Sequence, residues 1–165
     1  MPREPCQRKR QPNVDICACR SISSAAVLAT QGSRLNSSDA SRGTITVLHI
    51  EDDPSVARST ARLLRLAGYE VISAATRDEV MRFVEVGGLR PDLILTDFHL
   101  RTGTSDEIVL EIVALLHFKP PTIMLTGAAG RHPERAKSIA DRILVKPVDF
   151  NVLLNEIEYL LRTRK

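Results

Sequence analysis

Residues 45–54 read ITVLHIEDDP, an apolar and largely β-branched run that ends in three consecutive acids and a proline. Such a run bounded by polar residues is typical of a buried strand. Asp53 suits a helix N-cap, Pro54 suits the first helical position, and apolar residues follow at helical spacing as far as Gly68. The stretch therefore predicts a strand, then an acidic turn, then a helix.

The same alternation of apolar runs and amphipathic stretches continues along the chain, which is typical of βα units around a parallel sheet. Strands are predicted at 45–50, 70–73, 92–96, 121–125 and 142–145. Further helices are predicted at 76–86, at 105–116, within 127–140 as a short and weak element, and from Asp149 to the end of the chain. We therefore expect an α/β fold with a doubly wound, five-stranded parallel sheet in the flavodoxin-like order 2-1-3-4-5.

Composition divides the chain in two. Residues 1–42 are rich in Ser, Arg and Pro and hold seven Lys and Arg against three Asp and Glu, whereas residues 43–165 hold 16 against 17. The basic character therefore belongs to the first segment, and nucleic-acid binding by the second gains no support. We expect 1–42 to be a disordered basic tail, with a targeting peptide or a misassigned start codon as alternatives, and 43–165 to be the folded domain.

All three cysteines lie in the expected tail, so the folded domain cannot depend on a disulfide, and a cytoplasmic location is expected. Cys17 and Cys19 lack a second pair of ligands at metal-binding spacing and are interpreted as an ordinary pair. No apolar run approaches the roughly 18 residues of a membrane span, so no membrane association is expected.

Polar side chains follow the predicted strands where a doubly wound sheet gathers its functional groups. They are Glu51, Asp52 and Asp53 after the first strand, Asp97 after the third, Thr126 after the fourth and Lys146 after the fifth. Crowded carboxylates become favourable chiefly when a hard divalent cation joins them, and a lysine and a hydroxyl can hold phosphoryl oxygens. Asp97 is then the nucleophile, which needs no general base because a carboxylate is already ionised. Asp53 is assigned to helix capping.

Four motifs occur in order: VLHIEDDP at 47–54, PDLILTD at 91–97, PTIMLTG at 121–127 and ILVKP at 143–147. With the regular spacing of helices between them, they make residues 45–163 resemble a response regulator receiver domain. The resemblance extends to the chemotaxis regulators and to receivers attached to hybrid kinases.

The resemblance implies a phosphorylation site at Asp97 in a two-component phosphorelay. It implies Mg²⁺, or Mn²⁺, held by Glu51, Asp52, Asp97 and the main-chain carbonyl of His99, with Thr126 and Lys146 contacting the phosphoryl group and a cis Lys146–Pro147 bond. The expected partner is a histidine kinase or a histidine phosphotransfer protein. A receiver catalyses only its own phosphorylation and dephosphorylation and signals by protein contacts, and no DNA-binding domain is expected here.

The sequence departs from the family pattern at Ile143, where members usually carry an aromatic residue that reports phosphorylation, so the response is expected mainly in the 127–132 loop and the weak helix after it. A haloacid-dehalogenase-type phosphohydrolase is an alternative, but it needs an acid where this chain has His99 and a nucleophile after the first strand. A flavodoxin-like cofactor binder is another, but no glycine-rich loop follows the first strand.

Overall fold

The computed structural model describes residues 43–101, 103–127 and 134–164. The expected tail at 1–42 and most of the loop at 127–132 lie outside the described residues.

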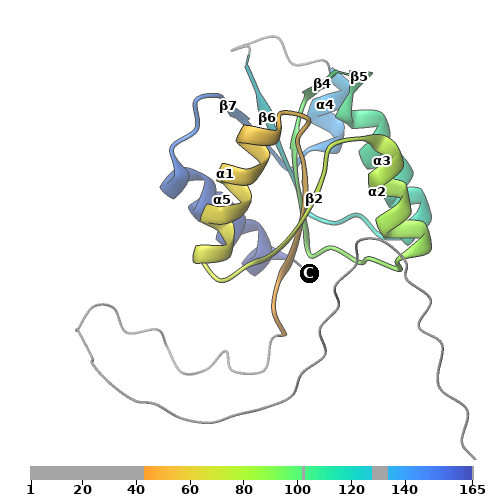
Figure 1. The fold of residues 1–165 in the computed structure, drawn as a ribbon, viewed down its shortest axis with the longest axis horizontal. Helices are drawn as coiled ribbons and strands as arrows, with labels where there is room; N and C mark the ends of the chain where they lie inside the picture. The colour runs from red at the N-terminus through yellow and green to blue at the C-terminus, as the bar shows by residue number, and fades with distance from the viewer. Residues whose placement is uncertain (1–42, 102, 128–133, 165) are drawn as a thin grey trace, which may run out of the picture. The chain divides into compact units, whose positions relative to one another are not determined.

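One parallel sheet organises the domain (Figure 1). Its strands are β1 (Thr46–Ile50), β2 (Glu70–Ala74), β3 (Leu93–Asp97), β6 (Thr122–Thr126) and β7 (Arg142–Val145). They lie in the order β2-β1-β3-β6-β7, which is the predicted order once the short strands β4 and β5 are set aside. The third and fourth of these strands each end one residue later than predicted, so Asp97 and Thr126 are the last residues of their strands.

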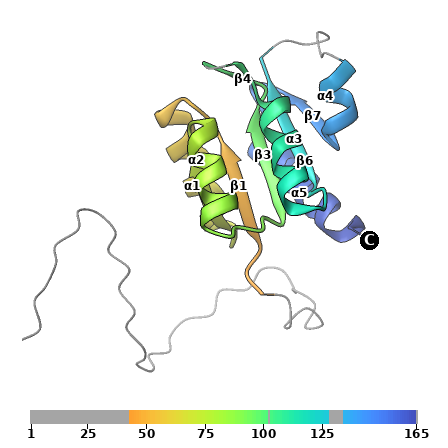
Figure 2. The same cartoon turned by 90° about the vertical axis from the view of Figure 1, so that its right-hand side faces the viewer.

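Helices cover both faces of the sheet, as Figures 1 and 2 show. On one face lie α1 (Pro54–Leu66) and α5 (Phe150–Thr163), and on the other lie α2 (Arg77–Met81), its continuation η1 (Arg82–Val86), α3 (Ser105–Leu116) and α4 (Glu134–Ile139). The predicted helix within 127–140 is indeed short, because α4 has six residues.

The core has two halves because successive side chains of a strand point to opposite faces of the sheet. Leu48 of β1 packs in the cluster beneath α2 and α3, whereas its neighbour Val47 packs with Leu153 and Ile157 of α5. All four side chains are at least nine-tenths buried. Each such burial contributes about 1.5–3 kcal/mol, so the two layers hold the strand ends in fixed positions.

Two aspartates begin the helices that flank the strand ends, as the sequence predicts. Asp53 Oδ1 accepts from the N–H groups of Ser55 and Val56 at 2.8 and 3.0 Å, and Asp149 caps α5 in the same way. These bonds satisfy N–H groups that have no partner inside the helix.

Two features were not predicted. The strands β4 (His99–Leu100) and β5 (Gly103–Thr104) form a small antiparallel hairpin directly after β3. The end of the predicted 76–86 helix is a π-helical turn, in which the Gly87 N–H donates to the Arg82 carbonyl five residues earlier at 2.9 Å.

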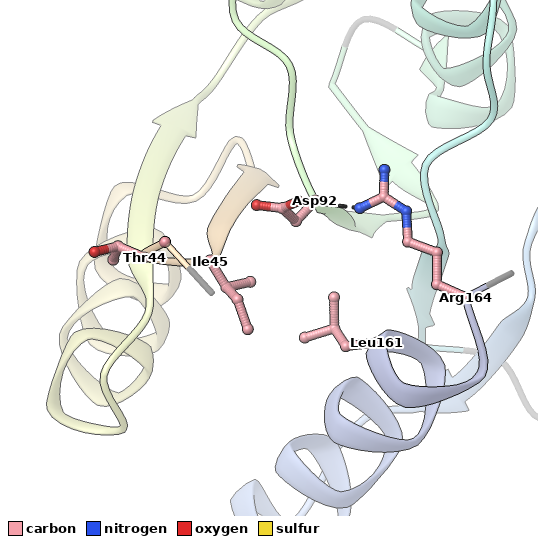
Figure 3. A pocket seen from close by; sticks show the side chains of 6 residues that line it. Thr44, Ile45, Asp92, Leu161 and Arg164 are labelled. Atoms are coloured by element: carbon pink, nitrogen blue, oxygen red, sulfur yellow. Dashed lines mark hydrogen bonds and ion pairs between the residues drawn. The ribbon is translucent and has the colours of Figure 1, made fainter. Parts of the chain in front are cut away.

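The edge where the strands begin carries a hollow of about 410 Å³ (Figure 3). Asp92 and Arg164 line it and form an ion pair at 3.0 Å, which ties the end of α5 to the segment before β3. Asp92 Oδ2 also accepts from the N–H of Thr46 at 3.0 Å. Because the strands are parallel, this hollow lies at the opposite edge of the sheet from the predicted site residues.

Candidate functional site

Three carboxylates meet at the edge where the strands end. Glu51 and Asp52 follow β1, and Asp97 ends β3, whose residue Thr96 pairs with Ile50 of β1. Glu51, Asp52 and Asp97 each offer an oxygen within 4.8 Å of the others. Their side chains are 2%, 17% and 14% exposed. The adjacency of β1 and β3, which the predicted strand order requires, thus brings all three together.

Lys146 reaches this cluster from the other side. It follows β7, and its Nζ lies 2.7 Å from Asp97 Oδ2 and 3.0 Å from Glu51 Oε2. Burial disfavours the charged lysine, but the hydrogen bonds and charges of Asp97 and Glu51 outweigh that effect and raise the Lys146 pKa above its usual value. The ammonium is therefore charged at neutral pH and neutralises part of the cluster.

Thr126 ends β6, the strand between β3 and β7, and it is fully buried. Its main-chain carbonyl accepts from the Lys146 N–H at 2.7 Å, and the Lys146–Pro147 bond is cis, as predicted. Thr126 therefore lies between the strands that carry Asp97 and Lys146.

His99 adjoins the cluster through its main chain. The His99 N–H donates to Asp97 Oδ1 at 3.3 Å, and His99 is exposed at the start of the hairpin. Use of its carbonyl as a metal ligand stays a prediction.

Arg101 is a site residue that the sequence analysis missed. Its N–H and Nε donate to Asp52 Oδ2 at 2.9 and 3.0 Å, and its Nη2 donates to the Asp52 carbonyl at 2.7 Å. Although desolvation acts in the opposite direction, these bonds hold the Asp52 pKa below its usual value. In the sequence this contact was marked by nothing more than an arginine four residues after Asp97, in the turn of a hairpin that was not predicted.

His49 lies near the end of β1, two residues before Glu51, and is 1% exposed. Burial, together with the charges of Lys146 and Arg65, lowers its pKa to about 4, and its Nδ1 has no hydrogen-bond partner among the described residues. The imidazole is thus neutral at neutral pH and too deeply buried to act as a phosphodonor.

The carboxylate cluster fits a divalent cation. In the part of the chain that the structure describes, these three carboxylates are paired with two side-chain cations, Lys146 and Arg101. Hard cations such as Mg²⁺ prefer oxygen ligands of this kind, and Glu51, Asp52 and Asp97 are the residues that would hold one.

A family model described as the response regulator receiver domain matches residues 47–158. This chain is a member of that family. The phosphohydrolase alternative gains no support, since the match is to receivers and Asp97 stands at the third strand of the sheet.

Among relatives, the receiver is 31% identical over 121 residues to the transcriptional regulatory protein PrrA of Mycobacterium bovis, which covers 72% of this chain and 50% of PrrA. The chain thus spans about half the length of that relative. The chemotaxis response regulator CheY4 of Vibrio cholerae superposes with a TM-score of 0.62 at 27% identity, over 72% of this chain and 99% of CheY4.

The response regulator protein TrrA of Thermotoga maritima, solved in complex with Mg²⁺-BeF, gives a TM-score of 0.62 at 21% identity and covers 71% of this chain and 99% of its own. That likeness shows the fold. Within the part of the receiver that the structure describes, every helix is too short or too polar to span a bilayer.

Proposed function

We propose that this receiver accepts a phosphoryl group on Asp97 from a histidine kinase or a histidine phosphotransfer protein. The observation that carries the proposal is the contact of Asp97 Oδ2 with Lys146 Nζ at 2.7 Å, beside two further carboxylates, at the edge where the strands end. If Asp97 were only a structural residue at a turn, it would need neither Lys146 nor two further carboxylates beside it.

The transfer is a substitution at phosphorus. A carboxylate oxygen of Asp97 attacks the phosphorus of the donor phosphohistidine, the P–O bond forms as the P–N bond breaks, and the imidazole leaves with the electron pair of that bond. The product is an acyl phosphate on Asp97. No general base is required, because the attacking carboxylate is ionised.

Glu51 and Asp52, together with Asp97 and the carbonyl of His99, are the residues that would hold Mg²⁺ or Mn²⁺. When bound, such a cation neutralises charge on the phosphoryl oxygens. TrrA binds Mg²⁺-BeF in its structure, and the donor set of this chain is of the same chemical kind that a magnesium ion prefers.

Lys146 holds its ammonium where a phosphoryl oxygen on Asp97 would lie, so it exchanges one anionic partner for another as the acyl phosphate forms. Thr126, at the end of the neighbouring strand, supplies a hydroxyl to the same group. The domain then signals through the proteins that read this state, and it catalyses only its own phosphorylation and dephosphorylation.

An apolar groove of about 540 Å³ between α1 and α5 suits the docking of the donor protein. Lys146 is one of its lining residues, and so are Val56 and Leu63 of α1, which are 39% and 41% exposed. A helix of the donor that fills this groove would bring its phosphohistidine to the same edge of the sheet as Asp97.

The test is phosphorylation of the full chain by acetyl phosphate in Mg²⁺, followed by intact mass. Wild type should gain one phosphoryl group and Asp97→Asn none. Asp92→Asn is the matched control, because Asp92 lies before the same strand at the opposite edge, and it should be modified like wild type. Phosphorylation of Asp97→Asn at the wild-type level would refute the assignment.

A further inference from the structure

Arg101 binds Asp52, one of the three acids of the carboxylate cluster. Two of its N–H groups converge on Asp52 Oδ2, and a third binds the carbonyl of the same residue. The arginine side chain is 72% exposed, whereas that of Asp52 is 17% exposed. The guanidinium therefore approaches from solvent and covers the open side of the acid.

The three contacts are not equally compatible with a cation bound to Asp52. The main-chain N–H of Arg101 can remain on Asp52 Oδ2 while the other lone pairs of the carboxylate bind a cation. The guanidinium cannot stay without cost, because a fixed positive charge hydrogen-bonded to a ligand oxygen repels a divalent ion on the same group. Arginine does not lose its proton in proteins, so it must move away to relieve this repulsion.

We infer that Arg101 competes with the divalent cation for Asp52 and so sets the cation affinity of this receiver. The inference rests on the proposed function, in which Glu51, Asp52 and Asp97 hold that cation. Lys146 offsets part of the negative charge of Glu51 and Asp97 on one side, and Arg101 pairs with Asp52 on the other. Among the described residues, the cluster is thus paired with two side-chain cations when no metal is bound, and Arg101, the more exposed of the two, can leave toward solvent.

The size of the effect follows from the exposure of the pair. An exposed arginine–carboxylate contact shifts an equilibrium by about two- to fivefold, and the repulsion of a nearby divalent ion adds to it. Removal of the Arg101 charge should therefore tighten Mg²⁺ binding by about three- to tenfold. Because both terms are electrostatic at the surface, the difference should shrink as the salt concentration rises.

The experiment is a titration of the full chain with MgCl₂, followed by the amide NMR shifts of residues 51–53, without any phosphodonor. Arg101→Gln removes the charge but keeps a polar side chain of similar reach, and Arg101→Lys keeps the charge. Arg77→Ala is the control, since Arg77 pairs with Glu111 at 2.6 Å on α3, outside the site.

We expect tighter binding in Arg101→Gln, nearly wild-type binding in Arg101→Lys and Arg77→Ala, and a smaller gap between Arg101→Gln and wild type at high salt. Equal or weaker binding in Arg101→Gln than in wild type would overturn the competition while leaving the cation site in place. A lack of saturable Mg²⁺ shifts in wild type and all variants would instead remove the cation site itself, and the competition with it.

Discussion

Replacement of Lys146 by methionine tests how the site is held together. Methionine has a similar length but no charge, so Lys146→Met leaves Glu51 and Asp97 beside each other with no ammonium between them. Their side chains are 2% and 14% exposed, and solvent can screen them only in part. The variant should therefore be less stable than wild type when no divalent cation is present.

The magnitude follows from the two contacts at 2.7 and 3.0 Å. At an effective dielectric constant of about 20, charges this close attract by roughly 5–6 kcal/mol for each contact, whereas in bulk water the figure is about 1.5 kcal/mol. The lysine is 29% exposed and loses part of its hydration in the site, which offsets much of the attraction. We expect Lys146→Met to lower the free energy of unfolding by about 2 kcal/mol at pH 7.

The assay is urea unfolding followed by circular dichroism in EDTA, on the full chain. Lys119→Met is the matched control, because Lys119 pairs with Asp141 at 3.1 Å at the surface, and it should cost less than about 0.5 kcal/mol. In an Asp97→Asn background the cost of Lys146→Met should fall by about 1 kcal/mol or more, since one of the two carboxylates is neutral there.

The pH dependence of this cost has a definite sign. In the folded protein the pKa of Lys146 is raised above its usual 10.5. The stability that the charged lysine contributes is therefore fully present below pH 10.5 and is lost only as the pH rises through the folded pKa. The gap between Lys146→Met and wild type should thus be constant from pH 7 to about 10. A gap below about 0.5 kcal/mol at pH 7, or the same gap in the Asp97→Asn background, would refute the account of the site.

Three further predictions concern the surroundings of the site. Asp53→Ala should destabilise the fold through loss of the α1 cap, measured as a lower urea midpoint, yet keep the wild-type Mg²⁺ affinity in an NMR titration. Asp52→Ala should instead weaken Mg²⁺ binding strongly, and equal Mg²⁺ binding by Asp52→Ala and wild type would remove the metal site. Burial lowers the pKa of the His49 imidazole to about 4, so wild type should lose about 3 kcal/mol of stability between pH 6.5 and 4, where the unfolded chain binds a proton and the folded chain does not. His49→Gln should remove this part of the pH dependence. An unchanged slope of stability against pH in urea unfolding would contradict the prediction. Leu63→Glu, in the wall of the groove, should slow phosphotransfer from a histidine phosphotransfer protein about tenfold or more but leave acetyl phosphate labelling intact, and equal slowing with both donors would argue against docking there.

The strands and most helices could be predicted because each carries its own local signal. The run at 45–50 is apolar and β-branched, and Asp53 with Pro54 marks the start of α1. Once the strand order was set, the meeting of Glu51, Asp52, Asp97 and Lys146 followed from the geometry of parallel strands, all of which end at one edge.

The remaining features depend on interactions that no local pattern records. The hairpin of β4 and β5 has two residues in each strand, too few for any periodicity. The π-helical turn at Arg82–Val86 keeps a helical pattern of side chains and differs only in its hydrogen bonds. The contact of Arg101 with Asp52 joins residues 49 positions apart through a long side chain, so it required the three-dimensional arrangement of the hairpin against the end of β1.

The central claim is that Asp97 becomes an acyl phosphate. The most direct measurement is to phosphorylate the full chain with acetyl phosphate and Mg²⁺, reduce it with borohydride, which converts an aspartyl phosphate to homoserine, and locate the product by peptide mass spectrometry. The account predicts conversion at Asp97, which disappears when Mg²⁺ is removed with EDTA. Conversion at Glu51, Asp52 or another acid in place of Asp97, or no conversion at all, would contradict it.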